Sequence, residues 1–375
     1  MRIPLFCPNP LCPNHSPERK ESAGWFTPNG TYSTRAFGTV QRFRCLSCGR
    51  GFSEQTFSID YYAKRTLPYG ELFHMLYTTS SIRDMARAFR VKPDTVLNKL
   101  SRLARNCLER LVKLNDMVRL QENLVADGFE NFTVSQFFPC SINFLVGKRS
   151  QFVYWFDYVT LRRKGRMTED QKARREELEH RFRADPKGIE RSFEALSLAC
   201  ARYVSSGDRP KIFLYTDEHG TYNRVLTKSV VPKTLVKHGR IEHIRIPSKR
   251  ARTVMNPLFS VNYIDRQLRK DVAECVRETV CFGKNISRCI DRLVVYLTYH
   301  NLYKPFREQK KLFYSHACAA GIPEDTVKGM TEGLFTERSF LGEKGIDGPY
   351  RKAWLRDYVT PLKKKEEYLP HFAVA

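Results

Sequence analysis

The sequence predicts an α/β protein with a mixed sheet, preceded by a small metal-stapled module and a helical region. Three observations lead to this prediction. Two cysteine pairs occur within the first 48 residues, and apolar residues recur at spacings of three and four between about residues 66 and 118. Apolar strands then precede a stretch in which helices and strands alternate. Strands followed by this alternation indicate a mixed sheet covered by helices.

The composition indicates a polyanionic partner. The chain has 375 residues, and 64 Lys and Arg against 40 Asp and Glu give a formal net charge of +24. Such an excess favours nucleic acid, because cations neutralise phosphates. No apolar run approaches the roughly 18 residues of a spanning helix, and the first residues lack the apolar core of a signal peptide. We therefore expect a cytoplasmic protein without a membrane partner.

Residues 1–60 predict a zinc ribbon. "CPNPLC" supplies Cys7 and Cys12, and "CLSC" supplies Cys45 and Cys48. Two thiol pairs, each on its own turn, match the needs of a tetrahedral structural Zn²⁺ site. The first pair has four intervening residues and the connecting loop is long, so His15 could replace Cys12 as a ligand.

Residues 61–118 predict a helix-turn-helix. An apolar stripe from Ile82 to Phe89 marks a first helix, and Pro93 suits the first turn of a second helix. The polar face of that second helix carries side chains that can reach phosphates and base edges. These candidate DNA-binding residues are Thr95, Asn98, Lys99 and Arg102. An ordinary helical hairpin would show the same apolar pattern, and the basic net charge favours DNA binding.

Residues 119–320 predict the sheet. "NLVADGFENF", "SINFLVG" and "SQFVYWFDYVTL" are expected to form three successive strands, and a charged helical insertion is expected near 161–195. "KIFLY" and "IEHIRIP" predict two further strands, and a long helical stretch begins near Pro257. We expect residues 321–375 to form a basic C-terminal segment.

Three aspartates in this region are candidate metal ligands. Asp127 lies within an apolar strand and Asp217 ends another, while Asp265 lies at the margin of a helix, one turn after Asn262. A charge inside a buried strand is costly unless it is paired or binds metal. Three such acids can hold two divalent cations for phosphodiester chemistry.

These residues also resemble a family. The zinc ribbon, the helix-turn-helix and the segments "VADGFENF", "YTDEHGTY", "NPLFSVNYIDRQLRK", "RETVCFGKN" and "YHNLYKPFR" are similar, in this order, to bacterial insertion-sequence transposases of the DDE class. The resemblance implies an RNase H-like catalytic domain in which Asp127, Asp217 and Asp265 hold Mg²⁺ or Mn²⁺. The chain has Asp at the third position, where Glu is usual in the family. Asp271, Glu274 or Glu278 therefore stays open as the third acid.

Other cations and polar residues in these segments are candidate DNA contacts. Aromatic residues alternate with cations there, and this suits base stacking combined with phosphate binding. The candidates are Asn262, Arg269, Lys284, Lys304 and Arg307.

The resemblance implies a DNA transposase that cleaves and joins the ends of an insertion element. Its expected partners are double-stranded DNA, from element ends and target, and further copies of the chain on that DNA. Two alternatives remain: a DNA-binding regulator that has lost catalysis, and an RNase H-like nuclease without strand transfer.

Overall fold

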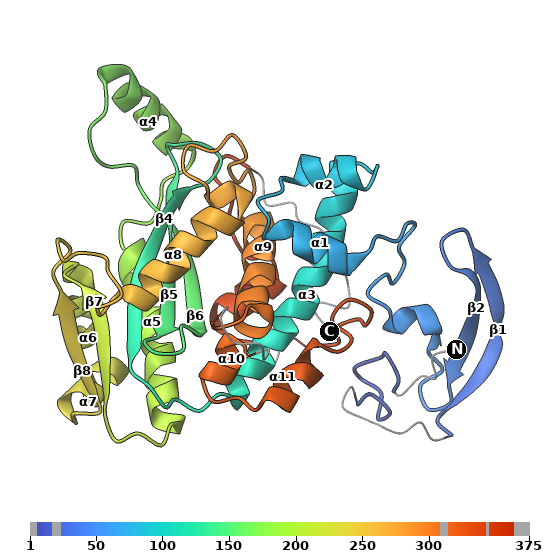
Figure 1. The fold of residues 1–375 in the computed structure, drawn as a ribbon. Coiled ribbons are helices and arrows are strands. Elements are labelled where there is room, and N and C mark those ends of the chain that lie inside the picture. Colours follow the sequence, from blue (N-terminus) through green and yellow to red (C-terminus); the bar gives the residue numbers. More distant parts are fainter. Residues whose placement is uncertain (1–5, 17–23, 308–313, 343–344, 364–375) are drawn as a thin grey trace.

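The N-terminal part of the protein is a small antiparallel sheet. In the computed structural model, which describes residues 6–16, 24–307, 314–342 and 345–363, this sheet has the order β1-β2-β3. The strands, drawn at one end of the molecule in Figure 1, are β1 (Phe26–Thr34), β2 (Gly38–Cys45) and β3 (Gly51–Ser53), followed by the short helix η1 (Glu54–Phe57). Trp25, Phe43 and Phe52 form with buried cysteines a hydrophobic cluster of their own. A module this small buries little apolar area, so it is expected to need an additional source of stability such as a bound metal ion.

Three helices follow, as the apolar periodicity predicts: α1 (Tyr69–Leu76), α2 (Ile82–Ala88) and α3 (Pro93–Met117). The Ser81 hydroxyl accepts from the amide of Asp84, whose carboxylate accepts from the amide of Ser81, and this capping box begins α2. Pro93 stands in the first turn of α3, where its missing N–H costs nothing.

The central element is a five-stranded mixed sheet with the order β6-β5-β4-β7-β8. β4 (Leu124–Phe132), β5 (Pro139–Gly147) and β6 (Val153–Thr160) pair antiparallel, whereas β7 (Ile212–Asp217) runs parallel to β4 and to β8 (Ile241–Ile246). All five predicted strands are confirmed. Because β5 and β6 are largely buried, their sequences are mostly apolar and do not alternate, whereas β4 contains Asp127, Glu130 and Asn131 and is only partly buried.

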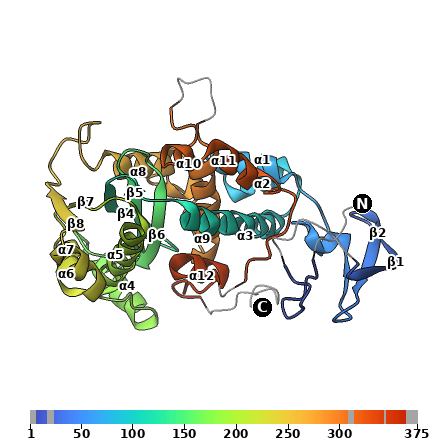
Figure 2. The ribbon, with the colours of Figure 1, turned by 90° about the horizontal axis from the view of Figure 1, so that it is seen from below.

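Helices cover both faces of this sheet. α5 (Gly188–Ser206) packs against β5 and β6, and α8 (Phe259–Asp271) packs against β4 and β5; Figure 2 shows the two helices on opposite sides. α6 (Gly220–Lys228) and α7 (Val230–Lys237) connect β7 to β8. The charged insertion is α4 (Glu169–Arg181), which buries only Leu178 and projects from the body in Figure 1. The expected insertion extends to 195, but α5 already belongs to the packed layer.

The last part of the chain joins the preceding ones. α9 (Ile286–Thr298) packs along α3 and continues into a π-helical turn, η3 (Tyr299–Tyr303). A short turn, η2 (Ala273–Cys275), precedes α9, and α10 (His316–Ala319), α11 (Glu324–Thr331) and α12 (Gly348–Trp354) follow. One hydrophobic core includes residues from Ile59 to Tyr358, so the three-helix region and the sheet share their apolar interior.

The expectation that Lys99 and Arg102 lie on an open polar face is wrong. Lys99 is 4% exposed, and its ammonium forms an ion pair with Asp60 and donates to the carbonyl of Arg65. Arg102 donates to the carbonyls of Ile59 and Tyr61. The segment that enters the helical region therefore covers this face of α3, and both cations hold that segment. Asn98 stays exposed and Thr95 is half-buried.

Replacing Lys99 should therefore destabilise the protein and not act through phosphate binding. Lys99→Ala leaves the Asp60 carboxylate buried without its cation, which costs about 3–5 kcal/mol of the free energy of unfolding. Lys92→Ala, at an exposed cation just before α3, is the matched control and should change stability by less than about 0.5 kcal/mol. Urea unfolding of both variants checks this, and equal stabilities would show that the ion pair contributes nothing.

Candidate active site and metal centre

The four N-terminal cysteines gather in one cluster. Their sulfur atoms all lie within 4.8 Å of one another, with Cys7 Sγ 3.6 Å from Cys48 Sγ and Cys12 Sγ 3.7 Å from Cys45 Sγ. A tetrahedral site with bonds of about 2.3 Å requires sulfurs about 3.8 Å apart. The arrangement fits a single metal ion and is consistent with structural zinc.

Neighbouring groups orient these sulfurs. The backbone amide of Asn14 lies 3.4 Å from Cys12 Sγ, and its side-chain amide lies 3.9 Å from Cys45 Sγ. N–H donors of this kind stabilise thiolate ligands. His15 is not part of the cluster, because its Nδ1 lies 2.7 Å from the carbonyl oxygen of Cys7. The alternative in which His15 replaces Cys12 as a ligand is therefore wrong, because Cys12 is the residue that joins the cluster.

Strand pairing brings the first two candidate acids level with each other. The parallel pairing of β4 and β7 joins Val125 to Tyr215, so Asp127 and Asp217 each lie two residues farther along. Adjacent strands are about 4.8 Å apart. The Asp127 carboxylate accepts from the amide of Gly128 at 2.8 Å, and the Asp217 carboxylate accepts from the amide of His219 at 2.9 Å. Both acids are thereby oriented by the backbone that follows them.

Helix α8 supplies the third acid. Val261, Ile264 and Leu268 are fully buried, and this stripe fixes the rotation of α8 on the sheet. Asp265 then lies near Asp127, within β4, on the side where β7 ends at Asp217. All three aspartates line one cavity of about 410 Å³, together with Asn262 and Arg269.

The cavity holds negative charge in a poorly solvated place. Burial, together with the carboxylate of Asp217, raises the pKa of Asp127 to about 6, although the amide of Gly128 opposes the shift. Burial and the nearby Asp127 likewise raise the pKa of Asp265 to about 7, against the opposing effect of Arg269 and Arg252. Taking charge out of water and crowding like charges both disfavour the ionised form.

The three acids have no cationic side-chain partner among the described residues. Asp265 Oδ1 is buried without a hydrogen-bond partner, and none of the three carboxylates forms an ion pair with a described Lys or Arg. Among the described residues, only the four cysteines bring three or more ligand atoms within 4.8 Å. The three carboxylates are spread more widely than that.

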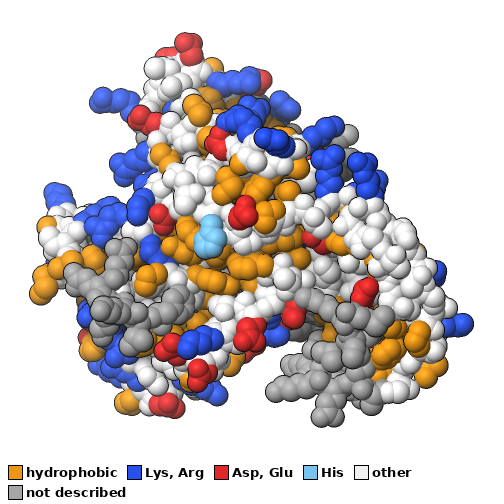
Figure 3. All heavy atoms as spheres, turned by 45° about the vertical axis from the view of Figure 1, so that its right-hand side comes forward, with side chains coloured by type: hydrophobic (Ala, Val, Ile, Leu, Met, Phe, Trp, Pro, Cys, Tyr) orange, Lys and Arg blue, Asp and Glu red, His pale blue; other side chains and the backbone are white. Residues whose placement is uncertain are grey.

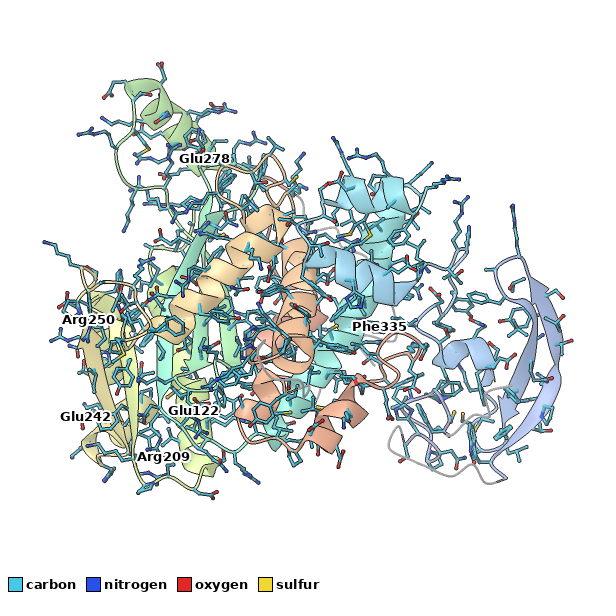
Figure 4. All side chains as sticks on the ribbon, in the orientation of Figure 1. Glu122, Arg209, Glu242, Arg250, Glu278 and Phe335 are labelled. Carbon is cyan, nitrogen blue, oxygen red and sulfur yellow. The ribbon has the colours of Figure 1, made fainter. Side chains whose placement is uncertain are left out.

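The open alternatives for the third acid are engaged elsewhere. Asp271 accepts from the hydroxyl of Tyr296 at 3.1 Å, and Glu274 forms an ion pair with Arg292. Glu278 lies in the segment beyond α8 (Figure 4) and does not line the cavity. Of the four candidates, Asp265 is the acid that faces Asp127 and Asp217.

The remaining predicted DNA contacts have different positions. Lys304 is 9% exposed, with Nζ 3.7 Å from Asp271 and a hydrogen bond to Gln267, so the expectation that it lies on a binding surface is wrong. Arg269 donates to the carbonyls of Glu130 and Cys275 while it lines the cavity. Asn262 is a buried lining residue, whereas Lys284 lies over the Phe282 ring and Arg307 is exposed.

Sequence reasoning missed several residues of this cavity. Glu130, Tyr222, Arg252 and Arg266 all contribute to its lining. Glu130 lies three residues after Asp127 and Tyr222 five residues after Asp217. Their closeness in sequence to the candidate acids could have identified them as lining residues. Arg252 follows β8 in a segment without apolar periodicity, so nothing local pointed to it.

Purified protein should carry one zinc per chain. Cys45→Ser with Cys48→Ser removes two of the four clustered ligands and should abolish zinc binding, as measured by elemental analysis of the reduced, folded protein. Cys281→Ser, at an exposed cysteine outside the cluster, is the control and should keep the metal. Zinc-free parent protein with a normal fold would contradict the prediction.

The raised acid pKa values predict a stability that depends on pH. Asp265 binds a proton more tightly in the folded protein than in the unfolded chain, where its pKa is 3.8. Without divalent metal, this acid therefore lowers the free energy of unfolding as pH rises from about 4 to about 7.

Asp265→Asn should accordingly raise the melting temperature of the metal-free protein at pH 8 by several degrees. The same change should weaken stabilisation by added Mg²⁺, because a ligand is lost. Thermal melts with and without Mg²⁺ measure both effects, and Glu218→Gln, exposed and outside the cavity, is the control. A parent protein that is more stable than the variant at pH 8 without metal would contradict this reading of the cavity.

Comparison of the chain with models of known protein families gives no match, and comparison with curated proteins gives none either. Within the described ranges, no helix combines the length and the apolar character needed to cross a membrane. The function must therefore be argued from the site itself.

Proposed function

We propose that this protein is a DNA transposase that cleaves the ends of a mobile element and joins them to new DNA. One observation carries the proposal: two neighbouring strands and a helix bring Asp127, Asp217 and Asp265 to one cavity in which no described cation is paired to them. Carboxylates that share a poorly solvated cavity without a cationic partner are costly unless they hold metal.

The sheet supports an RNase H-like catalytic domain. Three antiparallel strands are followed by two parallel ones, and the first strand of the sheet lies at its centre beside the fourth. This order places an acid of the central strand beside the end of the next parallel strand, where ligand sites of open α/β sheets form. Helix α8 then reaches the same place from one face of the sheet.

The three acids would hold Mg²⁺ or Mn²⁺, which supplies activation of a water or 3′-hydroxyl and stabilisation of the leaving oxygen. The chain's own residues prepare this site. The amides of Gly128 and His219 fix the orientations of the Asp127 and Asp217 carboxylates. Packing of α8 holds Asp265 in place, and burial keeps bulk water from weakening the electrostatic interactions.

Cations around the acids would bind the phosphodiester backbone. Arg252, Arg266 and Arg277 line the cavity with the acids, so a phosphate can sit between arginines and metal-bound carboxylates. Lys and Arg side chains also gather along the upper part of the face in Figure 3. The surface that we assign to DNA recognition surrounds the α2–α3 turn and consists of Thr95 and Asn98 with exposed Arg83, Arg87, Arg90 and Lys92.

The four-cysteine cluster would bind Zn²⁺ in a structural role. It lies in the N-terminal module, which packs through Phe6 and Phe57 on Phe340 near the other end of the chain. Assembly of two or more copies on DNA would bring both element ends together.

Asp217→Asn tests the proposed chemistry. The variant keeps the shape of the side chain but removes the charge that the cations require, so cleavage of a supercoiled plasmid carrying the element ends should fall by several orders of magnitude. Asp127→Asn should do the same, and the double variant should be scarcely worse because the acids act as a unit. DNA binding should persist or become tighter, since one fewer negative charge faces the phosphates.

Glu218→Gln is the control, because Glu218 is exposed and does not line the cavity. It should cleave nearly as the parent does. If Asp217→Asn cuts and joins DNA like the parent, the carboxylates are not catalytic. If the parent protein nicks the plasmid without joining DNA, it is a nuclease. If the parent binds the plasmid but neither nicks nor joins it, it is a regulator.

A further inference from the structure

Two segments beside the acidic cavity expose apolar side chains. Val254 and Met255, between β8 and α8, are 73% and 81% exposed, and Val280, beyond the far end of α8, is 89% exposed. Figure 4 shows Arg250 in the first segment and Glu278 in the second, near opposite ends of α8. Val254 and Met255 are adjacent in the chain, so they present one exposed apolar pair beside the cavity-lining segment.

Both segments are joined directly to the cavity. Arg252, two residues before Val254, lines it, and so does Arg277, three residues before Val280. Val254 and Met255 therefore follow a cavity-lining residue within two and three positions of the chain.

The first segment is held in a defined shape. The buried side-chain amide of Asn256 donates to the carbonyls of Arg250 and Ala251 at 3.3 and 2.9 Å, and its oxygen accepts from the amide of Leu258 at 2.9 Å. The backbone amide of Asn256 also donates to the carbonyl of Thr253 at 3.0 Å. The base of the loop is thus fixed, while the tip carries Val254 and Met255 into solvent.

The charges of this loop identify the class of its partner. Lys249, Arg250 and Arg252 are all exposed and no acidic residue occurs between Pro247 and Leu258. Some DNA-bending proteins bind the phosphate backbone with cationic side chains and insert exposed apolar side chains between adjacent bases. The positive charge of this loop is therefore complementary to the phosphates of duplex DNA.

We infer that Val254 and Met255 form a wedge that unstacks base pairs of duplex DNA beside the phosphodiester bond held at the acids. The inference rests on the proposed function and adds how DNA enters the site. Asp127 and Asp265 line a cavity, and a straight, stacked duplex offers its phosphates on a stiff convex surface. Unstacking one step costs a few kcal/mol and bends the duplex, so that the backbone can enter the cavity.

The test compares binding to two duplexes of about 30 bp and one sequence, intact or with a single central mismatch, in buffer without added Mg²⁺ and without chelator. A mismatched base is cheaper to unstack, so the parent should bind the mismatched duplex roughly tenfold more tightly. Val254→Ser with Met255→Ser should remove this preference while affinity for the intact duplex changes less than about twofold, because Lys249, Arg250 and Arg252 remain.

Val230→Ser is the matched control, since Val230 is 78% exposed and lies outside the cavity lining. It should keep the preference for the mismatch. A double variant that retains the preference would overturn the inference, and so would one that instead loses self-association in sedimentation, because the apolar pair would then bind a second copy of the chain.

The assay needs no cleavage, so it separates the wedge from the catalytic proposal. A parent that prefers the mismatch but never cuts plasmid DNA would refute the transposase chemistry alone. A parent that cuts plasmid DNA without any mismatch preference would refute the wedge alone.

Discussion

The parallel pairing of β4 with β7 is the constraint on which the candidate site depends. It sets Asp127 level with Asp217, although the two residues are 90 positions apart in the chain. A shift of one residue would turn one of the side chains to the opposite face of the sheet. The buried neighbours of Asp127 resist such a shift, because Ala126 and Phe129 are each 1% exposed and could not move without exposing apolar surface. The register of one short parallel pair thus decides whether two carboxylates can share ions.

The same site shows why burial and function conflict here. Hydrophobic packing around α8 and β4 stabilises the fold, but it also places carboxylates where charge is expensive. Two of the acids accordingly have raised pKa values in the metal-free protein. Divalent cations would remove this cost, so metal binding would stabilise the protein as well as supply its chemistry. Arg252 and Arg269 oppose these raised pKa values but do not cancel them.

Side chains far apart in the sequence connect the proposed DNA-recognition region to the proposed catalytic region. The Asn106 side-chain amide in α3 donates to the carbonyls of Leu334 and Glu337, and its oxygen accepts from the amide of Ser339. Asp291 in α9 accepts from both Ser101 and Arg356. Because α3 carries the candidate recognition surface at its start and packs on α9, DNA bound at that surface would be held at a fixed distance from the acids.

The sequence by itself determined the strands, the helical region, the four clustered cysteines and the two strand acids. These features are local. Thiol pairs on turns, apolar runs and a polar residue at a strand end can each be recognised within a few positions of the sequence. The tertiary structure decided what local patterns cannot contain. Lys99 and Arg102 lie on a face that is polar by periodicity but becomes covered when residues 59–65 fold back over α3. Lys304 turns inward toward Asp271, and Arg252 enters the cavity from an irregular segment. Other segments cover part of the polar face of α3, and only the folded chain shows which of its cations remain outside.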